Sequence, residues 1–165
     1  MDTTYYLQQF QSAADQIDKT LLASKQLEVA VGLYGDSVFL KLYKKSWATM
    51  GQDPLTAETR IFFSVWTCDS AIQEQKLLYN IHAFKLRKLK GYSIESKKFA
   101  DGFRHRFKRF EHKWPNVGSN FGPLTLMQGW IKPDLEDLPN EITRLSNNFL
   151  EIEHLIENTL ANFKR

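Results

Sequence analysis

Carboxylates and a lysine are spaced along this chain in a way that suggests metal-assisted hydrolysis. Asp69 follows a run of strand-forming residues, and Glu95-Ser96-Lys97 occurs farther along the chain. In a metal-dependent nuclease, carboxylates hold a divalent cation and a lysine steadies the attacking water. The same Glu-x-Lys spacing recurs at residues 74–76 and 111–113, so it carries little information in a chain rich in Glu and Lys. A small metal-dependent nuclease is therefore the alternative hypothesis, and we assign no catalytic residue.

The remaining reactive side chains are scattered. Metal ligation needs His, Cys or carboxylates that converge, but the sequence has no HExxH or CxxC motif. The closest pair is Asp101 and His105, one helical turn apart, which is more typical of a local contact. Cys68 falls within or just after a hydrophobic strand, where a free cysteine behaves as a small apolar residue. We expect no metal and no cofactor. The histidines are His82, His105, His112 and His154.

Signatures of acyl transfer and nucleotide binding are also missing. There is no GxSxG elbow, Walker loop or GxGxxG turn. The glycine-bracketed stretch from Gly118 to Gly122 lacks a following Lys-Ser/Thr, so we interpret it as a plain turn rather than an anion cradle.

Positive charge is concentrated in one segment, and this is the best functional clue in the sequence. Residues 85–113 contain 11 Lys and Arg against 3 acids, which gives +8, whereas the rest of the chain, with 11 against 16, carries −5. A basic helix in this segment could lie on phosphates, and most of its affinity would come from counterion release. The predicted contacts for nucleic acid are Lys97, Lys98, Arg104, Arg106, Lys108 and Arg109.

A second interpretation of the basic segment needs no partner. Charge runs are usually solvated helix faces, and this one could pair with the chain's own acidic C-terminal helix. We favour this interpretation of the charges themselves. For function, we expect a non-catalytic binding or interaction module that uses the basic helix on nucleic acid, another phosphate-bearing partner or an acidic protein surface. The acids in question are Glu141, Glu151, Glu153 and Glu157.

The first part of the chain predicts a helix and a hairpin. Apolar residues at spacings of three and four, from Leu7 to Leu21, indicate a helix over residues 4–24, with Thr3 or Thr4 as its N-cap. Residues 27–43 alternate around Gly35-Asp36, which predicts a two-residue hairpin. If Tyr34 pairs with Ser37, the large aliphatic residues of both strands share one face, and Gly32 lies opposite Phe39 on the other.

The middle of the chain predicts further strands and the basic helix. Residues 60–68 are rich in β-branched and aromatic types and indicate a third strand. Residues 75–89 fit either a strand or a helix, and we favour a strand, with residues 69–74 as the loop before it. Residues 93–112 predict a helix whose phenylalanines form one apolar stripe, and 124–131 a short extended piece. The stripe comprises Phe99, Phe103, Phe107 and Phe110.

The C-terminal segment predicts one long helix. From Ile142 to Ile156 the apolar residues follow a 3-4-3-4 spacing, which extends to Leu160 and Phe163 with one slip, and Pro139 suits the first turn. A stripe of this length needs helical partners. Either it packs on the N-terminal helix of the same chain, or part of it pairs with a second copy in a two-fold dimer. We expect intrachain packing for the first half and hold a homodimer and a monomer as equal alternatives.

These elements define an α+β fold in a single domain, residues 1–165. We expect an antiparallel sheet of three to four strands, packed on one face by the N-terminal, basic and C-terminal helices. The single cysteine and the absence of an N-terminal leader favour a cytoplasmic location. No window approaches the roughly 18 consecutive apolar residues of a membrane span.

Overall fold

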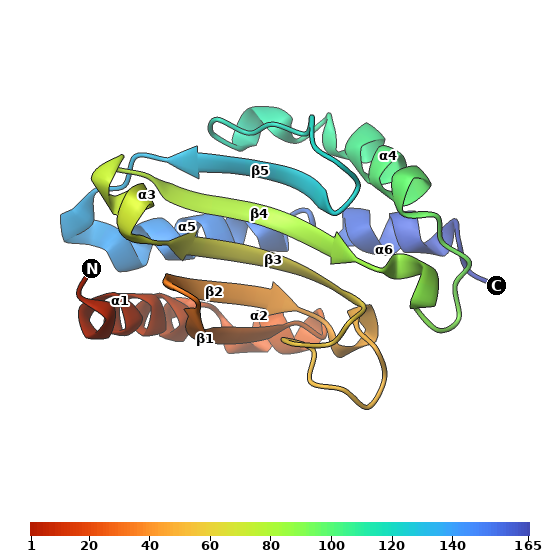
Figure 1. Cartoon of the computed structure of the whole chain (residues 1–165), viewed down its shortest axis with the longest axis horizontal. Helices are drawn as coiled ribbons and strands as arrows, with labels where there is room; N and C mark the ends of the chain where they lie inside the picture. The colour runs from red at the N-terminus through yellow and green to blue at the C-terminus, as the bar shows by residue number, and fades with distance from the viewer.

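The centre of the molecule is an antiparallel sheet of five strands in the simple order β1-β2-β3-β4-β5. A computed structural model describes all residues, 1–165. Each strand pairs with the next one along the chain, so the sheet is a meander (Figure 1). The strands are β1 Glu28–Tyr34, β2 Ser37–Tyr43, β3 Arg60–Thr67, β4 Leu77–Phe84 and β5 Thr125–Ile131.

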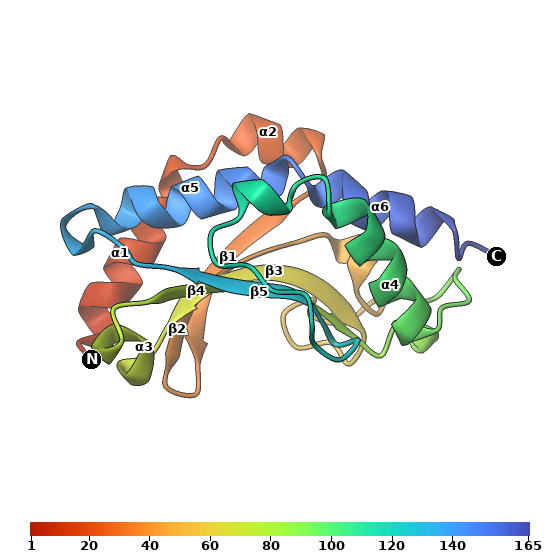
Figure 2. The same ribbon diagram turned by 90° about the horizontal axis from the view of Figure 1, so that it is seen from above.

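Helices cover one face of this sheet and leave the other uncovered (Figure 2). α1 packs on α5, and α4 packs on α6. None of the helices has both the length and the apolar character needed to cross a bilayer. The helices are α1 Thr3–Gln16, α2 Lys19–Ser24, α3 Asp69–Gln73, α4 Ser96–Phe107, α5 Leu138–Leu150 and α6 Glu153–Ala161, with short 3-10 turns at Lys45–Trp47, Leu86–Lys88, Glu111–Lys113 and Leu135–Asp137.

The α+β fold is as predicted, with one strand more than expected. The added strand is β5, which the sequence indicates only as a short extended piece at residues 124–131. The ambiguous residues 75–89 form β4, as favoured. The loop expected at 69–74 is instead the short helix α3, and the basic helix is shorter than predicted, because α4 ends at Phe107.

The hairpin has the predicted register. Tyr34 pairs with Ser37, and the pairing continues to Glu28 opposite Tyr43. Gly35 has φ +58°, the left-handed conformation that a tight two-residue turn requires. The Phe39 ring covers Gly32, since its Cζ would lie 3.0 Å from a Cβ at that position. This cover of a strand glycine by a cross-strand aromatic ring is also as predicted.

Both terminal helices are interrupted, whereas each was predicted to be continuous. Ile17 is extended, and Asp18 then starts α2 by accepting a hydrogen bond from the Leu21 backbone N–H. As a result Leu22 is buried, and Leu21, predicted to face inward, is 38% exposed. The N-cap of α1 is Asp2 rather than a threonine.

The C-terminal helix breaks into α5 and α6 at residues 151–152, because its two halves pack on different helices. α5 packs on α1, which is the predicted intrachain contact, and α6 packs on α4. At its end, the Phe163 ring lies 6.1 Å from the Phe99 ring of α4. The far end of the stripe therefore has a partner within the chain.

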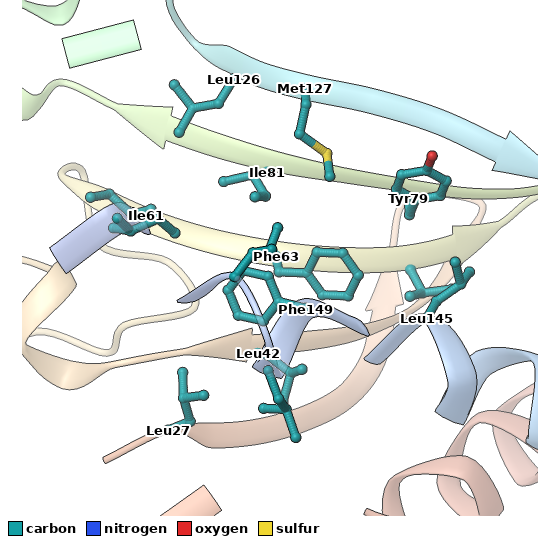
Figure 3. Packing of buried hydrophobic residues seen from close by; sticks show 14 of the residues in the cluster. Leu27, Leu42, Ile61, Phe63, Tyr79, Ile81, Leu126, Met127, Leu145 and Phe149 are labelled. Atoms are coloured by element: carbon teal, nitrogen blue, oxygen red, sulfur yellow. The ribbon is translucent and has the colours of Figure 1, made fainter. Parts of the chain in front are cut away.

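The core lies between the sheet and its helices and is dominated by aromatic rings. Phe63 of β3 stacks on Phe149 of α5, with ring centroids 4.6 Å apart, and Figure 3 shows the two rings face to face. Trp47 contacts the edge of Phe149, and Trp114 contacts that of Phe63. Alternate residues of β3 thus enter this core, while the residues between them point to the uncovered face.

Candidate functional site

The residues of the nuclease hypothesis lie far apart. Asp69 begins α3 at one end of the sheet, and Glu95 precedes α4 at the other (Figure 1). Asp69 pairs with the N-terminal amino group at 2.9 Å, and Glu95 pairs with Lys98 at 2.8 Å. No group of three His, Cys, Asp or Glu side chains lies close enough together to hold a metal ion. The arrangement that this hypothesis requires is not present.

The structure also places the other candidate residues from the sequence analysis. Asp101 and His105 are both exposed on α4 without a third ligand. Cys68 is half-buried after β3, with its Sγ 3.3 Å from the Ser70 hydroxyl. In the glycine-bracketed loop, Gly118 exchanges two backbone hydrogen bonds with Gln128, so the start of this loop extends the sheet beside β5.

The basic segment divides into paired and unpaired cations. Arg104 donates to four backbone carbonyls, those of Phe121, Gly122, Thr125 and Leu126, and thereby fixes the loop before β5. Arg106 donates to the Gly102 carbonyl, and Lys98 pairs with Glu95. Three of the six predicted contacts are therefore engaged inside the chain. The other three, Lys97, Lys108 and Arg109, are exposed, and their side chains make no ion pair or hydrogen bond within the chain.

The acidic residues of the C-terminal segment pair with the basic segment at one point, so the partial pairing that we expected is limited to a single contact. Glu153 and Glu157 both pair with Lys44 at 3.0 Å, and Glu153 also contacts Lys25 at 3.4 Å. Glu141 pairs with Arg144 in its own helix. Only Glu151 reaches the basic segment, through Lys113 at 4.0 Å. The acids instead hold the end of β2 and the end of α2 against α6.

The uncovered face of the sheet carries a pocket that sequence reasoning missed. It has a volume of about 600 Å³, and we call it the open-face pocket. Its floor comes from β2, β3 and β4, and its rims come from the hairpin end at Tyr34 and Ser37 and from the loop residues Leu55 and Thr56. Figure 2 shows the hairpin and this loop both projecting below the sheet, on the side away from the helices.

Aromatic rings line the floor of the open-face pocket. The aromatic side chains are Phe39, Phe62, Trp66 and Phe84. Phe62 and Phe84 meet edge-on at 5.7 Å between ring centroids. Phe62 and Trp66 alternate with core residues along β3, because successive side chains of a strand point to opposite faces. The floor is thus rigid, apolar and built on paired strands.

Two cations lie over these rings. The Lys41 Nζ is 4.5 Å from the Phe39 centroid and 4.4 Å from that of Phe62. The Arg60 guanidinium carbon is 5.5 Å from the Phe62 centroid and 4.9 Å from that of Phe84. Contacts of this kind stabilise a cation by about 0.5–2 kcal/mol. Phe62 lies between the two cations and is shared by them.

Neither cation has a carboxylate partner. No aspartate or glutamate pairs with Lys41 or Arg60, whereas Lys44, directly after β2, has two glutamates. Arg60 donates to the Ala57 carbonyl, but its Nε is buried without a hydrogen-bond partner. Lys41 and Arg60 are both half-buried, and charges that are partly removed from water are normally paired, because their desolvation is costly. Two unpaired cations in one apolar pocket are therefore an unusual feature of this molecule.

A line of polar side chains runs across the same floor. The Ser64 hydroxyl donates to Asn80 Oδ1 at 2.7 Å, and the Asn80 amide donates to His82 Nε2 at 3.0 Å and to Gln128 Oε1 at 3.4 Å. Ser64 and Asn80 are both nearly inaccessible to solvent. Because the amide nitrogen can only donate, His82 accepts at Nε2 and is neutral in this arrangement.

Electrostatics in the open-face pocket favour neutral side chains. Burial, followed by repulsion from Arg60, lowers the pKa of Lys41 to about 8. Burial, followed by repulsion from Lys41 and Arg60, lowers the pKa of His82 to about 4. Both changes have the sign expected for bases that are desolvated beside like charges. The pocket therefore carries positive charge without the carboxylates that would pair with it.

Comparisons with protein-family models, with curated proteins and with solved structures gave no match. The chemistry of the open-face pocket is therefore argued from its own geometry. One signal in the sequence could have indicated it, namely the alternation of Arg60, Phe62, Ser64 and Trp66 with apolar core residues. That alternation predicts a second face of β3 with aromatic and polar character.

Proposed function

We propose that this protein is a binding module that holds an anionic ligand with a flat ring in the open-face pocket. The observation that carries the proposal is the pair of unpaired cations, Lys41 and Arg60, over the aromatic floor. The proposal keeps the non-catalytic binding role expected from the sequence but moves it from the basic helix to the sheet.

An anion is the ligand that these two cations lack. A carboxylate or phosphate beside Lys41 and Arg60 would accept from the Lys41 amine and from the accessible part of the Arg60 guanidinium, which have no carboxylate partner within the chain. Hydrogen bonds to charged groups contribute about 1.5–3 kcal/mol each, roughly twice as much as neutral ones. Because the site is partly desolvated already, little further desolvation of the protein would oppose binding.

A flat ring suits the rest of the pocket. Phe84 and Trp66, which are half-buried, offer apolar surface on which a planar group can stack, whereas Phe62 is covered by Lys41 and Arg60. The line of Ser64, Asn80 and His82 offers hydrogen bonds beside that surface. A pocket that is largely apolar, with a few convergent polar groups, is the usual form of a small-molecule site.

The test uses tryptophan side chains as reporters. The chain has four tryptophans, of which Trp66 lines the pocket, whereas Trp47 and Trp114 are buried in the core on the other face. Indole N–H signals are followed by NMR during titration with 4-(hydroxymethyl)benzoate, a carboxylate probe, and with adenosine monophosphate, a phosphate probe. The Trp66 signal should move with at least one probe, while those of Trp47 and Trp114 stay in place.

Matched variants assign the effect to charge in the pocket. Arg60→Gln should weaken binding by about tenfold or more, because it removes a charged hydrogen bond worth about 1.5–3 kcal/mol. Arg87→Gln removes the same charge from an exposed site outside the pocket and should leave the affinity unchanged. The proposal is wrong if the Trp66 signal responds to neither probe, or if both variants weaken binding equally.

A second candidate function uses the basic segment, and its unpaired cations support it. Lys97 and Lys108 lie on one side of α4, three turns apart, and Arg109 follows. Replacing Lys97, Lys108 and Arg109 with Ala should weaken binding to single- and double-stranded DNA of any sequence and flatten its salt dependence. The control replaces Lys19, Lys45 and Lys132, which are exposed and lie outside residues 85–113, and so removes equal charge elsewhere. Equal losses in both triple variants, or no DNA binding at low salt, would refute this function.

A further inference from the structure

Two lysines of β2 and its end have opposite surroundings. The Lys44 Nζ lies 3.0 Å from carboxylate oxygens of both Glu153 and Glu157. Although burial alone would lower the pKa of Lys44, its hydrogen bonds to these glutamates raise it above the usual value. Lys41 has two aromatic rings and Arg60 around its amine instead. The same strand therefore presents one firmly protonated lysine on the core side and one lysine suited to lose its proton in a pocket.

We infer that Lys41 is a nucleophile, whose amine forms a reversible imine with an aldehyde or ketone carbonyl carried by the anionic ligand of the open-face pocket. The inference rests on the proposed function, because the ligand must first bind there. It adds a covalent step and a substrate class, flat anionic carbonyl compounds, to that function.

The surroundings of Lys41 increase the fraction of neutral amine at physiological pH. The titratable groups that face it are Arg60 from β3, His82 from β4 and Tyr34 from the hairpin end, and none of them is a carboxylate. The nearest acid of the neighbouring strand, Glu28, pairs with Lys45 at 3.8 Å instead. Lysines that act as nucleophiles are commonly activated in this way, by an apolar pocket and a neighbouring cation.

The population of reactive amine follows from its pKa. With a pKa of about 8, about a quarter of the Lys41 amines are neutral at pH 7.5, against roughly one in a thousand at the ordinary value. A less basic amine is also a weaker nucleophile, which offsets part of this gain. A rate advantage of about tenfold over exposed lysines remains after both effects.

The pocket also supplies the means to orient the carbonyl. Arg60 and Lys41 both lie over the Phe62 ring, so an anion held by Arg60 would place the rest of a flat ligand close to the Lys41 amine. The two cations cover Phe62, which is only 6% exposed, so the ligand would lie against them and the half-buried rings of Phe84 and Trp66. Holding the two reacting groups together in this way makes the addition effectively unimolecular.

The covalent step is balanced without any other reagent. The Lys41 nitrogen lone pair attacks the carbonyl carbon, a C–N bond forms, and the carbonyl oxygen takes up a proton. The resulting carbinolamine loses its oxygen as water together with the two hydrogens that the neutral amine brought. The product is an imine, and addition of water reverses the sequence. Nothing is oxidised or reduced.

The experiment traps the imine with 4-formylbenzoate, which has a flat ring, a carboxylate and an aldehyde. Sodium cyanoborohydride reduces any imine to a stable secondary amine, and peptide mass spectrometry then locates and quantifies it. At pH 7.5, Lys41 should be labelled about tenfold faster than exposed Lys45. Labelling of Lys41 should rise with a midpoint near pH 8. Benzaldehyde, which lacks the carboxylate, should keep this advantage in amine reactivity but label Lys41 more slowly than 4-formylbenzoate does, because Arg60 does not hold it in the pocket.

Two further measurements separate this inference from the proposed function. Lys41→Arg keeps the charge and removes the nucleophile, and Lys41→Met serves if the arginine does not fit. 4-(Hydroxymethyl)benzoate has the ring and carboxylate without the carbonyl, so the Trp66 NMR response reports binding alone. If Trp66 responds but Lys41 is labelled no faster than Lys45, the imine is refuted and the binding function stands. If Trp66 does not respond and Lys41 is not selectively labelled, both are refuted.

Discussion

Replacing Lys41 with methionine should make the protein more stable, although it removes a central residue of the pocket. The side chain of Lys41 lies along Phe39 and Phe62, and methionine has a similar unbranched length and fills the same space. The substitution removes a cation that is partly desolvated and has Arg60 nearby. Residues that are needed for function often lie in an unfavourable environment, and replacing them commonly raises stability while it lowers activity.

The magnitude follows from the proton affinity of Lys41. A pKa lowered from 10.5 to about 8 corresponds to a penalty of about 3 kcal/mol for the charged folded state, at about 1.4 kcal/mol for each tenfold change in proton affinity. Because Lys41 keeps part of its surface in water, solvent screening reduces this to about 1–2 kcal/mol. The contacts of the Lys41 amine with the Phe39 and Phe62 rings stabilise the charged form and offset about 0.5–1 kcal/mol of this penalty. We therefore expect Lys41→Met to raise the free energy of unfolding by about 1 kcal/mol at pH 7.

The sign of the pH dependence is opposite to that of a lysine in an ion pair. Between about pH 8 and 10.5, the unfolded chain holds the Lys41 proton and the folded chain has lost it, so the stability of the wild type rises with pH in this window. Below pH 8 both states are protonated and the penalty is complete. The advantage of Lys41→Met should therefore be largest near pH 7 and shrink by pH 9.5.

Urea unfolding at pH 7 and pH 9.5 measures this directly. The difference between wild type and Lys41→Met is the informative quantity, because other groups such as Tyr43, whose pKa is raised by burial, titrate in both proteins. Lys45→Met, at an exposed position, is the matched control. A Lys41→Met protein that is less stable than the wild type at pH 7, or a difference that stays constant between the two pH values, would refute the reasoning.

Three further changes test the fold around the pocket, each by urea unfolding. Gly35→Val should cost about 1–3 kcal/mol, because a β-branched residue is strained at φ +58°; coincident urea midpoints would contradict this turn. Phe149→Ala should cost about 3–5 kcal/mol, because the ring is fully buried against Phe63, and a loss below about 1 kcal/mol would contradict the core. Gly129→Ala should cost about 1–3 kcal/mol or more, because its Cβ would overlap the Tyr79 hydroxyl; unchanged stability would show that Tyr79 lies elsewhere.

The parts of the fold that could be predicted are those that depend on neighbours in the chain. The register of β1 and β2 follows from a two-residue turn and strict alternation, because a slip by one residue would reverse every side chain. Meander pairing of the later strands follows the tendency of consecutive strands to lie side by side. β5 was harder to predict, since it is completed by the Arg104 contacts that fix the loop before it.

The interruptions of the terminal helices could not be predicted from periodicity. Apolar residues at three and four spacings continue through Asp18, so the pattern does not show that the backbone turns there. Asp18 itself is a signal, since aspartate is a preferred N-cap, but it competes with an unbroken stripe. The C-terminal stripe keeps its 3-4-3-4 spacing across residues 151–152, where the helix breaks and its partner changes from α1 to α4, so only the packing of these helices reveals the break.

The open-face pocket could not be assembled from the sequence because its residues come from three strands. Lys41 lies opposite Ser64, and Ser64 lies opposite Asn80, so these side chains become neighbours only when both registers are known. Separated by about 20 residues each, they show no local motif. The basic segment, by contrast, is conspicuous in the sequence because its charges are contiguous.

Contiguous charge and unpaired charge are different properties, and only the second indicates a binding site. Arg104, within the conspicuous run, donates to four carbonyls, so its donors are used within the fold. Arg60, isolated in sequence, has no carboxylate partner within the chain. An unused donor in a pocket lowers stability until a ligand accepts from it, whereas a used donor gains little from one. The free energy available for binding an anion is therefore concentrated around Arg60 and Lys41, where the sequence shows the smaller number of charges.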